Sequence, residues 1–416
     1  ILWVGDNLIL NTKMALTDYK VAFDNTYQEF FNKKLVAKSI MNMRLEPMLT
    51  YGGSVTRVAM DLSAVLVRTV SRGSASTIDT ITDSTEALTI NLEKEAAFEI
   101  SDGEVTQTGP LKAMQTAGRE IAIKLATDLD ARCFAEVSNA LYSFDTGDLT
   151  TGTSSGVAIT LGNTTVPQMT TRMAAKLANK NNVYNENDMV LVVDSYGAGD
   201  IDQFLISKNI DIAASVFKNG YAGLIRGADL FISENLSSTQ VLSMATNVTA
   251  GDTITYNGVV WTARATPAVA GEFDIGVSAD ATRAILENAF NASATGQDSA
   301  TGYFEVSAAN RALIGSVVAT NNDTSNTLTI VRTGGGRVSV SETFTDGTDT
   351  WSANYLHCYF GKKGAIDLVV QDMKEVDVRE ASDRRASRIW SSYLAGLKTF
   401  ADGAKKFLFV KIAVVS

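Results

Sequence analysis

The part of the sequence that most constrains the fold is residues 108–143, which read TGPLKAMQTAGREIAIKLATDLDARCFAEVSNALYS. Pro110 suits the first position of a helix, because the N–H that proline lacks would have no intrahelical acceptor there. After it, apolar residues recur at steps of three, four or seven, at Leu111, Met114, Ile121, Leu125, Leu129, Cys133, Val137 and Leu141. The spacing predicts one helix over residues 111–143, roughly 50 Å long, which is unusual inside a globular enzyme.

Two segments upstream of this helix have the composition of strands. Residues 54–70 are rich in Val, Thr and Ser, and residues 87–100 alternate apolar with polar side chains. Between them lies the small, polar tip Ser71-Arg72-Gly73-Ser74-Ala75-Ser76. The pattern predicts a long two-stranded excursion. Because a lone hairpin is marginally stable in water, this one must pack against a neighbour.

The N-terminal region has an amphipathic pattern. Residues 17–46 place apolar side chains at roughly helical spacing, at Tyr19, Phe23, Tyr27, Phe30, Phe31, Leu35 and Ile40. Glu46-Pro47 ends any helix there. We therefore expect an arm that lies on another surface. Met14-Ala15-Leu16-Thr17 has the form of a translation start, so the first thirteen residues are expected to be an extension.

The rest of the chain predicts an α/β region with an insertion. Its expected elements are a helix over 166–180, strands over 188–193, 228–233, 351–360, 365–379 and 407–415, and short helical pieces between 201 and 226. No lysine occurs between Lys218 and Lys362. Residues 237–345 are interpreted as a small inserted α+β domain that folds by itself, with its ends close together. Within it we expect a hairpin at Asn257-Gly258, a helix over 278–291, and strands over 303–306, 328–332 and 337–340.

Composition and motifs give no support for catalysis. The net charge of −10 and the pI near 4.8 argue against tight, sequence-independent binding to DNA phosphates. Cys133 and Cys358 cannot form a disulfide framework or a zinc site, and His357 is interpreted as a core or interface histidine. Gly361-Lys362-Lys363-Gly364 lacks the spacing of a phosphate-binding loop and is interpreted as a turn. No catalytic set, metal site, cofactor or membrane-spanning helix is predicted.

The order of elements resembles that of the major capsid proteins of tailed bacteriophages, which have the Hong Kong 97-type fold. The resemblance lies in residues 88–99 leading into Ser101-Asp102-Gly103-Glu104, in the helix through 119–130, and in residues 393–398 followed by the strand 407–415. It covers about three quarters of the chain, everything except residues 237–345.

The resemblance implies an α+β fold with named subdomains. These are an N-terminal arm (1–50), an extended β loop (51–92), a peripheral domain (93–165 and 365–395) with the spine helix 111–143, an axial domain (166–236, 346–364 and 396–416), and the insertion domain (237–345).

The same resemblance implies a structural protein rather than an enzyme. Such a protein assembles with itself, as hexamers and pentamers, into the icosahedral head of a tailed phage and encloses double-stranded DNA without reading its sequence. Scaffolding, portal and decoration proteins are further expected partners, no membrane is involved, and the chain would be found in the virion after assembly in the bacterial cytoplasm. Contacts between subunits are expected from the extended loop, at Arg57, Arg68 and Arg72, and from the arm, at Tyr19, Phe23, Tyr27, Phe30 and Phe31.

Three other classes of protein stay open at this point. An encapsulin-like compartment shell resembles the same fold, but such shells are usually shorter and lack a hundred-residue insertion. A secreted β-rich adhesin or surface-layer protein would suit the Thr/Asn/Gly-rich segments, although the long predicted helix speaks against it. An enzyme is the least favoured.

We expect the assembled chains to be held together without covalent bonds. Some members of the resembled family join a lysine of the extended loop to an asparagine of the next subunit. Here no lysine occurs between Lys38 and Lys94, and arginine instead makes charge-assisted hydrogen bonds to carboxylates. Arg68 and Arg72 should therefore meet Asp or Glu of an adjacent subunit. Particles boiled in denaturant should run as single 44.4 kDa chains on a gel, and a ladder of covalent oligomers would contradict this.

Overall fold

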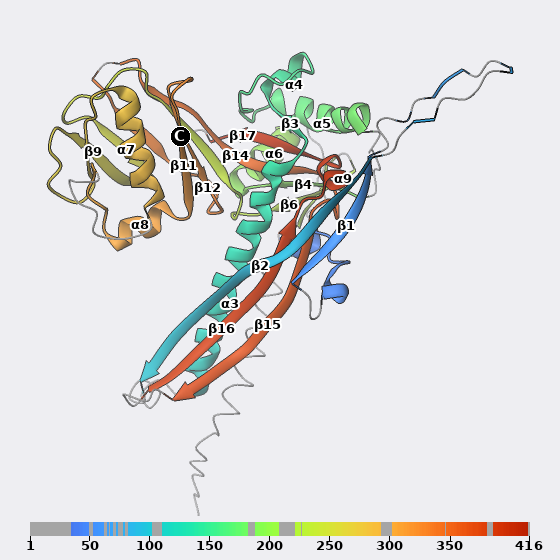
Figure 1. Cartoon of the computed structure of the whole chain (residues 1–416), viewed down its shortest axis with the longest axis horizontal. Coiled ribbons are helices and arrows are strands. Elements are labelled where there is room, and N and C mark those ends of the chain that lie inside the picture. Colours follow the sequence, from blue (N-terminus) through green and yellow to red (C-terminus); the bar gives the residue numbers. More distant parts are fainter. Residues whose placement is uncertain are drawn as a thin grey trace, which may run out of the picture. The chain divides into compact units, whose positions relative to one another are not determined.

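The computed structural model describes residues 35–49, 53–61, 65, 67–69, 72–73, 78–79, 82–101, 110–181, 188–207, 221–225, 227–292, 302–345, 347–380 and 386–414 (Figure 1). The chain divides into two compact units. The first unit contains residues 1–35, 90–127 and 370–396, and the second contains residues 36–89, 128–369 and 397–416. Most of the predicted arm lies outside the described residues.

Long strands and a long helix make up the first unit. The helix is α3 (Pro110–Ala135), and the strands are β2 (Thr82–Ser101), β15 (Asp367–Glu380) and β16 (Ala386–Lys398), as Figure 1 shows. With β1 (Ser54–Asp61) they form a sheet in the order β1-β2-β16-β15. β2 pairs antiparallel with β1 up to Thr89 and with β16 from Ile90 onward. Two strands of the expected excursion therefore pair, but the first ends at Asp61 rather than at residue 70, and the second begins at Thr82 rather than at residue 87. Most of residues 62–81 lie outside the described residues.

The long helix ends earlier than the sequence predicted. α3 stops at Ala135, a 3-10 turn η3 follows (Glu136–Asn139), and Ala140 is already extended. Residues 142–144 then form β3 (Tyr142–Phe144), which pairs in parallel with β17 (Phe407–Ala413). The prediction of a helix to residue 143 was wrong, because pairing with a distant strand outweighs the helical spacing of this apolar segment.

The second unit is built on a nine-stranded sheet. Its order is β11-β12-β7-β14-β4-β6-β5, with β17 paired to β14 and to β3. Every residue of β4 is buried, as expected for a continuous apolar strand. The remaining strands are β5 (Tyr221–Ile225), β6 (Ala228–Ile232), β7 (Ser238–Ser243), β11 (Val317–Asn322), β12 (Thr327–Arg332), β14 (Thr350–Lys362) and β4 (Met189–Val193) itself.

Several helices accompany this sheet. The predicted helix 166–180 is confirmed as α5. The turn predicted at 361–364 starts later than expected, because Gly361 and Lys362 still belong to β14 and the turn begins at Lys363. The helical elements are η1 (Ala37–Ser39), η2 (Glu46–Leu49), α4 (Thr146–Thr150), α5 (Thr165–Asn181), α6 (Ser195–Ser207) and α9 (Ala401–Ala404).

In its described residues, the segment predicted as an insertion contains a second sheet and two helices. The strands are β8 (Thr253–Tyr256), β9 (Val259–Arg264), β10 (Glu272–Asp274) and β13 (Val340–Thr343), and the helices are α7 (Ala279–Asn291) and α8 (Ala308–Ile314). Asn257 and Gly258 both have positive φ, 50° and 80°, which confirms the predicted two-residue hairpin. The expected strand at 303–306 was wrong, since Tyr303 makes only an isolated bridge to Phe273.

Only part of this segment forms a separate sheet. β7 lies between β12 and β14, so the strands of the predicted insertion and of the predicted axial domain share one sheet. The core around Trp261 and Phe290 also reaches Trp351, which lies beyond residue 345. Independent folding of 237–345 stays a prediction, and the packing shows that Trp351 completes its core.

Candidate functional site

Arg57 lies at the base of the extended loop, on β1. Its guanidinium nitrogens are 3.9 Å from Asp367 and 3.6 Å from Asp402, and its Cζ lies 4.6 Å from the centre of the Phe400 ring. Its side chain is 41% exposed. Arg57 thus already has carboxylate neighbours in its own chain, and a contact with another subunit stays a prediction that would use the exposed part of the side chain.

Arg68 and Arg72 lie in the outer part of the loop. Arg68 donates two hydrogen bonds to the carboxylate of Asp79, one of them 3.0 Å long, which joins the two sides of the loop. Arg72 is exposed in a turn in which Gly73 has a φ of 88°. A carboxylate partner in an adjacent subunit stays a prediction for both arginines.

The same part of the loop exposes apolar side chains that the sequence analysis did not single out. Val67 is exposed to 105% and Ile78 to 91% of their reference areas, and Val65 is half exposed. The sequence did contain a sign of them, because Val65 and Val67 lie in the Val- and Thr-rich segment that predicted a strand. Large apolar side chains in this state contribute nothing to the stability of the isolated chain.

The arm's aromatic residues, Tyr19, Phe23, Tyr27, Phe30 and Phe31, lie outside the described residues, so their role stays a prediction. The end of the arm is anchored to α3. Asp130 accepts hydrogen bonds from the N–H groups of Val36 and Ala37, each 3.0 Å long. Asp130 is fully buried, and burial raises its pKa to about 6 against the opposing effect of these hydrogen bonds.

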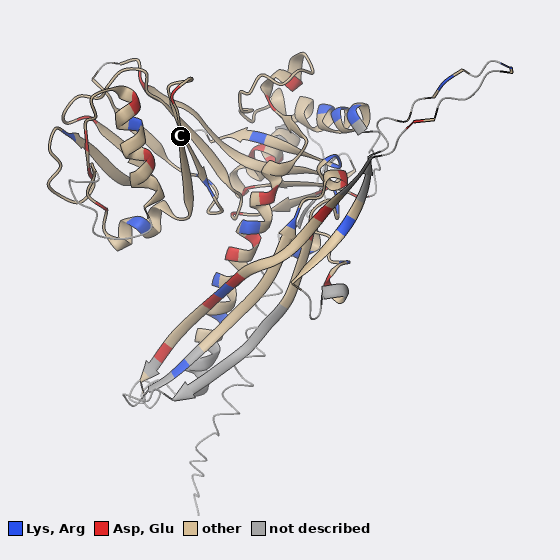
Figure 2. Cartoon of the chain, viewed as in Figure 1, with Lys and Arg blue, Asp and Glu red and all other residues tan. Residues whose placement is uncertain are grey.

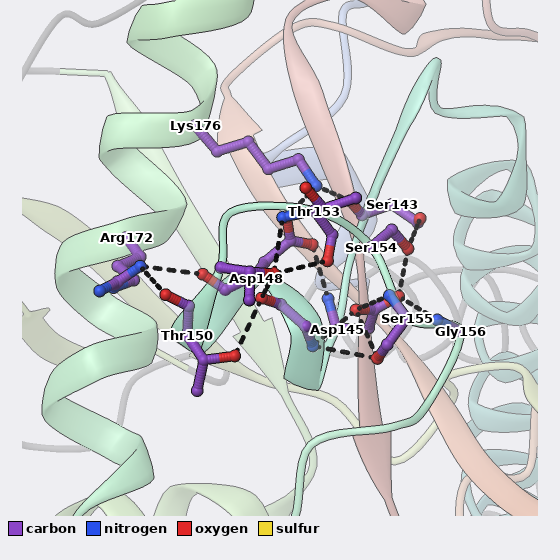
Figure 3. Close-up of polar contacts among 12 residues, drawn as sticks. Ser143, Asp145, Asp148, Thr150, Thr153, Ser154, Ser155, Gly156, Arg172 and Lys176 are labelled. Atoms are coloured by element: carbon purple, nitrogen blue, oxygen red, sulfur yellow. Dashed lines mark hydrogen bonds and ion pairs between the residues drawn. The ribbon is translucent and has the colours of Figure 1, made fainter.

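A dense polar cluster fixes the loop after β3 (Figure 3). The Asp145 carboxylate accepts N–H groups from Gly147, Ser155 and Gly156 at 2.8–3.0 Å. Burial alone would raise the pKa of Asp145, but hydrogen bonds from Ser154 and from these N–H groups lower it overall.

A second carboxylate of this cluster ties the loop to α5. Lys176 donates to Asp148 and to the carbonyl of Ser143, both at 2.6 Å, and Arg172 donates to the carbonyl of Thr150 at 3.2 Å. The donors and acceptors of the cluster therefore satisfy one another, and the arrangement closes a loop rather than presenting a reactive group.

His357 is a core residue, as predicted. It is 3% exposed, its Nε2 lies 2.7 Å from Thr239 Oγ1, and the Phe409 ring meets it edge-on at 4.6 Å. Burial and the nearby Lys411 charge lower its pKa to about 4, so it is neutral at pH 7. The described residues contain no group of three metal-ligating side chains and no helix long and apolar enough to span a membrane.

No protein-family profile matches the chain, and no curated protein is similar to it in sequence. Among solved structures, one from Mycobacterium phage Che8 is 16% identical, covers 90% of each chain and has a TM-score of 0.47. The capsid structure of the Cyanophage P-SCSP1u is 13% identical, covers 88% of this chain and 84% of its own, and has a TM-score of 0.43. The capsid of a native GTA particle is 10% identical, covers 91% and 89%, and has a TM-score of 0.43. Of these three structures, the second is named as a cyanophage capsid, the third as the capsid of a GTA particle, and the first only by its phage.

Proposed function

We propose that this chain is the major capsid protein of a tailed double-stranded DNA bacteriophage and that it assembles, as hexamers and pentamers, into the icosahedral head. The observation that carries the proposal is the outer part of the extended loop, where Val67 and Ile78 are almost fully exposed. Exposed apolar side chains on a two-stranded excursion gain stability only when another surface covers them. A second copy of the chain provides such a surface.

The negative net charge of the chain suits a protein that encloses DNA and later releases it. With a net charge of −10 it would bind phosphates weakly, so packed DNA could leave again. Scaffolding, portal and decoration proteins are proposed as further partners, and the virion, assembled in the bacterial cytoplasm, as the place where the protein is found.

Electron microscopy of the expressed protein tests this function. We expect closed shells with hexameric and pentameric capsomers, and double-stranded DNA inside particles purified from infected cells. Subunits that stay monomeric at all concentrations and salt conditions would contradict self-assembly. Shells that hold an enzyme instead of DNA would favour the encapsulin-like alternative.

The extended loop gives a point-mutation test. Replacing Val67 or Ile78 by Asp should leave the subunit folded, because both side chains are exposed, but should weaken assembly. Each change removes the free energy gained by burying one apolar side chain in the contact, about 1.5–3 kcal/mol, and places a charge at the same position. Sedimentation of wild type and variants over a range of concentrations measures the effect. Val277→Asp is the matched control, since Val277 is exposed to 102% in the insertion segment. Equal assembly of all variants would show that the loop is not buried between subunits.

A further inference from the structure

A cavity of about 330 Å³ lies in the second unit, beside the base of the extended loop. Four stretches that are far apart in the sequence form its wall. They are Asn42 and Arg44, Arg57 of β1, residues 362–367 between β14 and β15, and residues from 402 to 406 around α9. We call it the basic cavity, for the charges described below.

The wall of the basic cavity is held by backbone contacts. The N–H of Asn42 donates to the carbonyl of Ile366 at 2.8 Å, and the carbonyl of Asn42 accepts the N–H of Leu368 at 2.9 Å. A Cβ on Gly403 would come within 2.1 Å of the carbonyl oxygen of Ala365, so these two segments meet backbone to backbone. The backbone that frames the cavity is therefore fixed by the fold.

Basic residues dominate the wall. It contains two acidic residues, Asp367 and Asp402, and five basic residues: Arg44, Arg57, Lys362, Lys363 and Lys406. Asp402 is already 3.0 Å from Lys406 and 3.6 Å from Arg57. The side chain of Asp367 is only 5% exposed and already has partners, because its carboxylate lies 3.9 Å from Arg57 and accepts a hydrogen bond from the Asn42 amide at 2.6 Å.

Two of these cations have no counter-charge among the residues that the structure describes. Neither Arg44 nor Lys362 forms an ion pair with any residue in the described part of the structure, whereas Lys363 lies 2.5 Å from Asp229. Like charges gathered around one concave wall repel one another, and an anion placed among them relieves this repulsion. In a chain with a net charge of −10, the basic cavity is thus a local excess of positive charge that an anion would complete.

Two exposed carboxylates on β2 are candidates for this anion. Glu93 and Glu95 lie two positions apart on β2, so both side chains point to the same face of the strand, roughly 7 Å apart along it. Both are exposed, and neither side chain has a hydrogen bond or ion pair among the described residues. Figure 2 shows acidic positions in red along β2. We call Glu93 and Glu95 the acidic pair.

We propose that the basic cavity binds the acidic pair of a second copy of this chain, a contact between subunits that rests on the proposed function. The occupant is assigned to the acidic pair because its two exposed carboxylates are opposite in charge to Arg44 and Lys362 and have no side-chain partner among the described residues. The cavity and the acidic pair are different patches of one molecule, so their contact is head-to-tail. Head-to-tail contacts close into rings when the rotation per subunit allows it, which is the symmetry of hexamers and pentamers.

Charge reversal on each side tests the contact. Subunits carrying Arg44→Glu with Lys362→Glu should need a protein concentration about tenfold or more higher for half-assembly, because like charges would then face each other. Glu93→Lys with Glu95→Lys should cause the same loss from the other side. A variant with all four changes should regain assembly, because it restores opposite charges. Sedimentation and negative-stain microscopy measure the assembled fraction.

Several controls separate the possible outcomes. Lys180→Glu reverses an exposed cation outside the basic cavity and should assemble like wild type. Melting curves of unassembled subunits show whether each variant is folded. If the variant with Arg44→Glu and Lys362→Glu does not fold, the variant with Glu93→Lys and Glu95→Lys tests the contact. A four-site variant no better than the two-site variants would overturn the proposal. Normal assembly of the cavity variant, with less nucleic acid in its particles, would also overturn it and indicate a phosphate site. If wild type itself fails to assemble, the proposed function fails rather than this contact.

Discussion

Gly361→Ala is expected to be among the most destabilising single substitutions in the chain. Gly361 lies in β14, where it is paired with Phe407 of β17 on one side and with Val190 of β4 on the other. A Cβ at this position would come within 2.2 Å of the Cβ and 2.4 Å of the Cα of Phe407. No rotamer change relieves a clash with backbone and Cβ atoms, so the strands must separate.

Phe407 has no room to give way. It is fully buried, and its ring stacks on Tyr359 with 5.0 Å between centroids. We expect a loss of about 3 kcal/mol or more in the free energy of unfolding, at the upper end of overpacking effects. Chemical denaturation of unassembled subunits, with circular dichroism as the signal, measures it.

Gly199→Ala is the matched control for this prediction. Gly199 lies within α6, and a Cβ there would meet nothing within 4 Å. Alanine is the better helix former, so this variant should be as stable as wild type or gain about 0.5–1 kcal/mol. If Gly361→Ala were as stable as Gly199→Ala, the close pairing of β14 and β17 would be wrong.

Features determined by nearby residues could be predicted from the sequence. The hairpin at Asn257-Gly258 needs only two residues that tolerate positive φ between two short strands, and both have it. The buried strand β4 follows from five consecutive apolar residues, and α7 begins where Ser278 caps it by accepting the N–H of Ala281. In each case the deciding contacts lie within a few residues of one another.

Features that depend on distant partners could not be predicted. The end of α3 is decided by the pairing of β3 with β17, some 260 residues further on. β7 joins the larger sheet because β14 lies beside it, which no local pattern shows. The candidate site has the same character, since Arg57 meets Asp367 and Asp402 more than 300 residues away. The sequence identified the loop and its arginines, and the structure was needed to identify their intrachain partners.

The response of the subunit to acid is expected to reveal two opposing titrations. His357 has its pKa lowered to about 4 in the folded chain, so the unfolded chain binds the proton more tightly between about pH 6.5 and pH 4. Its contribution to stability is full above pH 6.5 and is lost as the pH falls through this range. A pKa difference of this size corresponds to on the order of 3 kcal/mol.

Asp130 acts in the opposite direction over nearly the same range. Its pKa is raised from 3.8 to about 6 by burial, so the folded chain binds the proton more tightly than the unfolded chain. Stability is therefore gained as the pH falls from 6 toward 3.8 and is lost as it rises again, also on the order of 3 kcal/mol. In wild type the two contributions largely cancel.

Single substitutions should separate the two titrations. His357→Gln keeps a polar group near Thr239 but does not titrate, so this variant should become more stable relative to wild type as the pH falls from 7 to 4.5. Asp130→Asn should show the reverse, with a growing deficit in acid, and the double variant should again follow the wild-type slope. Urea unfolding of unassembled subunits at several pH values gives these differences directly, and carboxylates common to all four proteins cancel from them. If His357→Gln kept the wild-type dependence on pH, then His357 would titrate normally in the folded chain, and its burial between Thr239 and Phe409 would have to be wrong.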